Sequence, residues 1–136
     1  MRRRYPWQEK ARLPAQLNIL HATPLGKRVA RAIAKTPQYL EIRRELAPYV
    51  RERIISKELA DAVLTEFLDE VVHRMPDDAA AVEKIVGIME MPRLEAFCTL
   101  VLRDAIRMID RRTGTKVTVI TDLGKMRIVI EQGGKK

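Results

Sequence analysis

Residues 56–75, SKELADAVLTEFLDEVVHRM, carry the strongest structural signal in the chain. Apolar residues recur there at alternating intervals of three and four, which predicts an amphipathic helix over about 57–75 with one wide buried stripe. Ser56 is a suitable N-cap, and Pro76 ends the pattern. The buried stripe is expected to contain Leu59, Ala60, Val63, Leu64, Phe67, Leu68, Val71 and Val72. The opposite, exposed face is expected to be acidic, with Glu58, Asp61, Glu66, Asp69 and Glu70.

Further helices are expected on both sides of this segment. Thr23-Pro24 and Thr36-Pro37 each combine an N-cap hydroxyl with a proline suited to the first helical turn, and Pro48 interrupts the second of these helices. Residues 93–112 are so apolar that their helix is expected to be central, with Gly114 as its stop. The expected helices span about 24–35, 37–46, 78–90 and 93–112, with a kinked helical segment at 7–20 broken by Pro14 and an Asp77 cap before residue 78.

The C-terminal segment changes to a strand pattern. Residues 116–121 and 125–131 are rich in β-branched residues, and Gly124 suits the left-handed position that closes a three-residue hairpin loop at 122–124. A lone hairpin is marginally stable in water, so this one is expected to dock on the helices, join a partner's sheet, or both.

The predicted fold class is therefore mainly α, with a basic N-terminal arm and kinked helices, a helical bundle and a C-terminal β-hairpin. We divide the chain into residues 1–55 (basic arm and helices), 56–114 (bundle core) and 115–136 (hairpin and basic tail).

Positive charge is concentrated at the N-terminus. The chain has a formal net charge of +8, and residues 1–35 alone hold nine basic residues against one acid, Glu9. Residues 56–110 are acidic and residues 111–136 are basic again. Such blocks indicate interaction surfaces, either for a polyanion or between oppositely charged segments of neighbouring copies.

The basic N-terminal region predicts contact with double-stranded nucleic acid. Lysine and arginine placed at phosphates release counterions, which gives salt-dependent binding with little sequence preference. The helix at 24–35 can rest its apolar side on protein while its basic side reaches phosphates. A solvated basic tail, or an arm bound only to protein, is the alternative. The expected DNA-binding residues are Arg2, Arg3, Arg4, Lys10, Arg12, Lys27, Arg28, Arg31, Lys35, Arg43 and Arg44.

No constellation of residues indicates an enzyme, a metal site, a cofactor or a small-molecule substrate. Cys98 is the single cysteine and lies on an apolar helix face, so a buried, inert role is expected. His21 and His73 have no partner at metal-ligand spacing, and Asp77-Asp78 suits a helix N-terminus better than acid–base catalysis. No signal peptide or membrane span is predicted.

The helices followed by a basic hairpin also allow a second interpretation. A dimeric winged helix-turn-helix regulator or chromatin protein would use the hairpin as a wing and the preceding helix for recognition. Only Arg103, Arg107, Arg111 and Arg112 of that helix could face a groove, and a helix so apolar suits a core better.

The layout resembles the major capsid proteins of filamentous archaeal viruses, of the rudivirus, lipothrixvirus and tristromavirus type, including those that infect Pyrobaculum. The resemblance covers about residues 1–112 and rests on length, charge layout and helix order. The scarcity of Asn and Gln beside abundant Glu, Lys and Arg is typical of a thermophilic source.

This resemblance implies a structural protein of the virion that packages linear double-stranded DNA, held in the A form, in a helical filament. It further implies contacts with other copies and with a related second capsid protein as a heterodimer, beneath a viral envelope in some types. The C-terminal hairpin departs from the simplest all-α pattern of these proteins.

Overall fold

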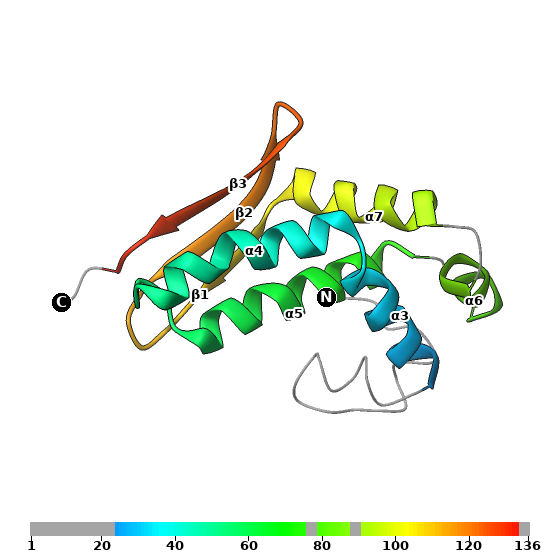
Figure 1. Cartoon of the computed structure of the whole chain (residues 1–136), viewed down its shortest axis with the longest axis horizontal. Coiled ribbons are helices and arrows are strands. Elements are labelled where there is room, and N and C mark those ends of the chain that lie inside the picture. The colour runs from blue at the N-terminus through cyan, green and yellow to red at the C-terminus, as the bar shows by residue number, and fades with distance from the viewer. Residues whose placement is uncertain (1–23, 76–78, 88–90, 134–136) are drawn as a thin grey trace.

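The computed structural model describes residues 24–75, 79–87 and 91–133. The basic N-terminal arm, the kinked segment predicted at 7–20, the Thr23 cap, the Asp77 cap and the last three residues lie outside these ranges. The described chain is mainly helical and ends in a three-stranded antiparallel sheet, which confirms the expected fold class (Figure 1). The elements are α3 (Pro24–Ala34), α4 (Pro37–Arg51), α5 (Lys57–His73), α6 (Ala79–Gly87), α7 (Met91–Asp104), β1 (Ile106–Ile109), β2 (Lys116–Asp122) and β3 (Lys125–Glu131).

Helix α5 is buried along the apolar stripe that its sequence pattern predicts. The Ser56 hydroxyl caps it by accepting a hydrogen bond from the Leu59 N–H at 3.0 Å. Val63, Phe67 and Val71 are fully buried and form the middle of the core. Helix α5 contacts α3, α4, α7 and β1, so its apolar stripe joins both halves of the molecule.

Thr36 links α3 to α4 by the predicted cap. Its side chain is completely buried, donates to the Ile33 carbonyl at 2.7 Å and accepts from the Tyr39 N–H at 3.3 Å. The expected end of the next helix near residue 46 is wrong, because α4 continues through Pro48 to Arg51. A proline in the last turn removes only one helical hydrogen bond, and Tyr49 and Val50 beyond it pack against the core.

The predicted helix over 93–112 is also too long. Helix α7 ends at Asp104, Ala105 takes a left-handed φ of 74°, and residues 106–109 form β1. Ile106 is buried and Arg107 is exposed, an alternation that suits a strand as well as a helix end. Pairing with β2 decides the outcome, since it places Ile106 beside Val119 in the core.

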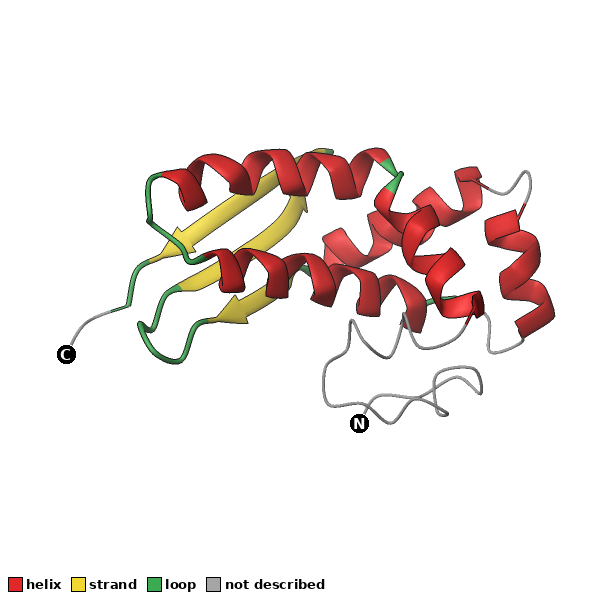
Figure 2. Ribbon diagram, turned by 60° about the horizontal axis from the view of Figure 1, so that its bottom comes forward, coloured by secondary structure: helices red, strands yellow, loops and turns green. Residues whose placement is uncertain are grey.

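The sheet has the order β1-β2-β3 and packs one face on the helices (Figure 2). Helices α5, α7 and α4 contact β1, β2 and β3 respectively. Val117 and Val119 of β2 are fully buried on that face. The sheet lies at one end of the molecule, whereas α3 and α6 lie at the other (Figures 1 and 2).

The hairpin loop is shorter than the three-residue loop expected. Asp122 pairs with Lys125, so only Leu123 and Gly124 form the turn. Their φ angles of 53° and 79° are both positive, which is the signature of a type I′ turn matched to the twist of the strands. The left-handed Gly124 was expected, whereas leucine is a costly residue at the position before it, so the sequence did not indicate the two-residue form of the turn.

Candidate nucleic-acid interface

Helix α3 has a basic exposed face and an apolar face that is buried in the core. Val29 and Ile33 are fully buried against the core, and α3 contacts α4, α5 and α6. The helix contains no acidic residue. Four cations follow its exposed side as the helical period predicts; we call them the basic face of α3, and they are Lys27, Arg28, Arg31 and Lys35.

Lys27, Arg31 and Lys35 follow one another at intervals of four residues, with Lys35 just beyond the helix end. At about 1.5 Å rise per residue this line extends over roughly 12 Å. Duplex DNA carries one phosphate charge per about 1.7 Å of its axis, so a line of this length that lies along the duplex spans several phosphates. In the described part of the chain no ion pair engages these three side chains.

Arg28 is held differently. Its guanidinium lies 3.1 Å from the Glu83 carboxylate of α6, and both side chains are about half exposed. An exposed pair of this kind contributes little to stability but reduces the charge that Arg28 can offer to a phosphate. We therefore regard Arg28 as the weakest of the four predicted contacts on α3.

Arg43 and Arg44 are both exposed on α4, as expected for the site. Helix α4 also carries Glu41 and Glu45, so its charge is nearly balanced, unlike that of α3. The structure thus brings Lys27, Arg28 and Arg31 onto one face of α3, with Lys35 in the turn just beyond it, and leaves the two α4 arginines on a separate, mixed-charge helix. The remaining predicted residues, Arg2, Arg3, Arg4, Lys10 and Arg12, lie outside the described ranges.

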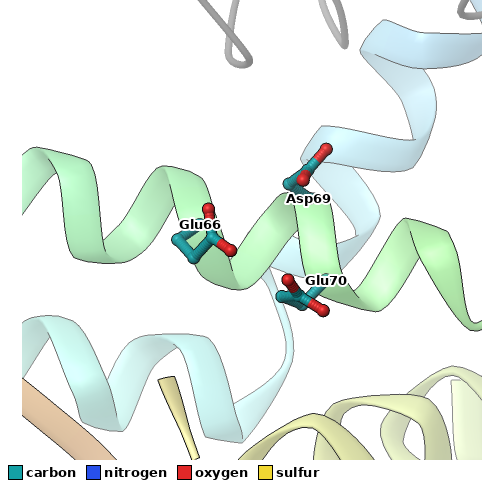
Figure 3. Close-up of side chains that lie close together, drawn as sticks. All are labelled: Glu66, Asp69 and Glu70. Carbon is teal, nitrogen blue, oxygen red and sulfur yellow. The ribbon is translucent and has the colours of Figure 1, made fainter. Parts of the chain in front are cut away.

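Three carboxylates of α5 come close together, as their spacing on the acidic face predicts. Oxygen atoms of Glu66, Asp69 and Glu70 lie within 4.8 Å of one another (Figure 3). Asp69 was expected on the exposed face but is buried, 6% exposed, with its carboxylate 3.6 Å from His73 Nδ1. The same His73 nitrogen lies closer, at 2.7 Å, to the backbone oxygen of Asp69, so the imidazole is hydrogen bonded to the main chain beside the buried carboxylate.

Glu70 pairs with Arg74, the residue that directly follows α5. Its carboxylate lies 3.1 Å from Arg74, which also pairs with Asp104 at the end of α7. Arg74 therefore connects two helices through two carboxylates. We therefore assign structural roles to two members of the acidic cluster, Asp69 beside His73 and Glu70 beside Arg74.

Cys98 is buried, as expected, and its Sγ lies 3.8 Å from the Thr36 hydroxyl. Burial raises the pKa of the Cys98 thiol to about 12. The nucleophilic thiolate is thus strongly disfavoured at neutral pH.

A cavity of about 360 Å³ lies between the α4–α5 connection and the β1–β2 turn. Arg53, Lys57 and Asp110 line it with the hydroxyl residues Ser56 and Thr115. The Ser56 hydroxyl already caps α5, and Lys57 lies 3.7 Å from Asp61. The lining combines both signs of charge and does not assemble a nucleophile with a base. No motif in the sequence indicated this cavity.

No protein-family model matches the chain, and no curated protein and no solved structure matches it either. Among the described residues, no helix has both the length and the apolar character needed to cross a membrane.

Proposed function

We propose that this protein is a non-enzymatic structural subunit that coats double-stranded DNA along its phosphate backbone, without sequence preference, in a helical filament. The basic face of α3 carries the proposal. Its apolar side is buried in the core, so the backbone positions from which its cations project are fixed before any ligand binds. Such preorganisation reduces the entropy lost when a polyanion is bound.

The chemistry of this face favours phosphate contacts over base recognition. Lysine and arginine at phosphates fix position and orientation but carry no sequence information. Amide side chains, which read adenine edges, do not occur on α3. We therefore expect affinity that depends steeply on salt and little on sequence.

The proposal extends to assembly through the resemblance to filamentous archaeal virus capsid proteins. In such a virion, copies of the chain would wrap linear DNA in the A form. Each copy would pair with a related second capsid protein as a heterodimer, and in some types an envelope would surround the filament. The basic N-terminal arm, with Arg2, Arg3, Arg4, Lys10 and Arg12, would add phosphate contacts to those of α3.

The winged-helix regulator remains the alternative against which the proposal is tested. Its recognition helix would be α7, but Leu94, Cys98 and Val101 of that helix are buried against the bundle. The strand β1 also follows α7 directly, so the hairpin is part of a three-stranded meander.

Electron microscopy of the purified protein with random linear duplex DNA tests the proposal. We expect filaments that are coated along their whole length, at a fixed ratio of protein to base pairs. Deletion of residues 1–12 should reduce DNA binding and leave the helical circular dichroism unchanged. A discrete footprint at one sequence, retained against excess random competitor, would refute coating in favour of the regulator.

A further inference from the structure

Strand β3 forms an edge of the sheet. It pairs with β2 through seven consecutive residues without a bulge, and within the described chain the sheet ends there (Figure 1). The strand contains no proline, and four of its residues are aliphatic or methionine. Natural edges are usually protected by proline, bulges, covering segments or charged side chains, because an open edge can pair with another strand. Strand β3 has charged residues, but they are of both signs and can therefore pair with those of a second strand.

The backbone groups available at this edge follow from the ladder. In an antiparallel pair, residues alternate between those that hydrogen bond to the neighbouring strand and those whose N–H and C=O point away from it. Lys125 closes the two-residue turn opposite Asp122 and belongs to the first set. Met126, Ile128 and Ile130 are therefore the residues whose backbone groups point out of the edge.

The sequence of β3, KMRIVIE, is self-complementary about Ile128. When two copies run antiparallel and are centred on this residue, Lys125 lies opposite Glu131 and Met126 lies opposite Ile130. Arg127, already bound to Asp122 of its own hairpin at 3.0 Å, lies opposite Val129. Every residue of the strand then has a partner, and opposite charges meet at both ends.

Other registers are less favourable for reasons visible in the same seven residues. A shift of the pairing by one residue places side chains of the core-facing side opposite those of the exposed side. Centring the pair on Arg127 puts two arginines directly opposite each other. Centring it on Val129 leaves Lys125 opposite glycine at residue 133, beyond the strand, and shortens the ladder.

We propose that β3 pairs with β3 of a second copy of this chain, antiparallel and centred on Ile128, so that two three-stranded sheets join into one. The result is an isologous contact of the kind that generates two-fold dimers. The sheet and α3 lie at opposite ends of the molecule, so this contact leaves the basic face of α3 accessible (Figures 1 and 2). The inference supplies the subunit contact of the coat proposed above, but its geometry does not require DNA.

Sedimentation equilibrium of the full chain without nucleic acid separates the two proposals. We expect a concentration-dependent dimer for the natural sequence. Lys125→Glu and Glu131→Lys should each weaken it by about tenfold or more, because each reverses a charge pair that occurs twice in a symmetric dimer. The double variant should restore the dimer.

The charge reversals also act inside the chain, and this gives an internal control. Lys125 lies opposite Asp122 and Glu131 lies opposite Lys116 within the hairpin, so the double variant should have the least stable monomer and yet recover the dimer. A monomer at all concentrations, or a dimer indifferent to these substitutions, would overturn the pairing. A double variant that is folded by circular dichroism but does not recover the dimer would overturn the register centred on Ile128.

Discussion

Replacing Lys27, Arg31 and Lys35 with glutamine removes three charges from the basic face of α3 and keeps a long polar side chain at each position. All three are exposed, so the fold should not change. Each phosphate contact contributes about 0.9 to the slope of log affinity against log salt, so the slope should become shallower by about 2.7. Relative to a reference at 1 M salt, this corresponds to a loss of affinity on the order of 500-fold at 0.1 M salt.

The assay is fluorescence anisotropy with a random duplex, measured over a range of salt concentrations. The matched control is the triple glutamine variant of Arg103, Arg107 and Arg111, which are equally exposed and lie where the winged-helix alternative places its contacts. We expect the control to keep the natural slope. The assignment of the interface to α3 would be refuted if the α3 variant kept the salt slope of the natural protein while the control variant had a reduced slope.

Three further predictions concern the fold. Leu123→Asn should stabilise the protein by about 1 kcal/mol in urea unfolding, because asparagine tolerates the left-handed turn better; the Leu123 side chain is 96% exposed, and an unchanged midpoint would contradict this. Thr36→Val should cost about 2 kcal/mol by removing both cap hydrogen bonds, whereas Thr36→Ser should cost clearly less; equal losses would count against the cap. The unfolded Cys98 thiol ionises near pH 9 while the folded one stays protonated to about pH 12, so stability should fall with rising pH in this window. Between pH 9 and 12, the unfolding free energy of the natural protein should therefore fall, relative to that of Cys98→Ala, by about 1.4 kcal/mol per pH unit. A difference between the two proteins that stays constant with pH would exclude this linkage.

The sequence predicted those parts of the fold that depend on local chemistry. Ser56 and Thr36 cap their helices as expected, and the stripe containing Val63 and Phe67 is buried. The exposed side of α3 also followed from the helical period, since a single helix wheel separates Val29 and Ile33 from the cations.

The errors arose where a distant segment decides the local structure. Residues 106–109 continue the apolar pattern of α7 and become a strand only because β2 lies beside them. Asp69 belongs to the polar side of α5 by spacing but is buried in the folded chain. Arg28 is paired by Glu83, a residue of another helix that no local pattern connects to it.

The left-handed leucine at residue 123 has a consequence for the order in which the protein folds. A type I′ turn with asparagine and glycine can close a hairpin by itself, but Leu123 opposes that turn locally. We therefore expect an isolated peptide of residues 106–131 to remain largely unstructured. The strands must acquire their pairing from the surface that α5 and α7 offer, so collapse of the helices should precede or accompany closure of the sheet.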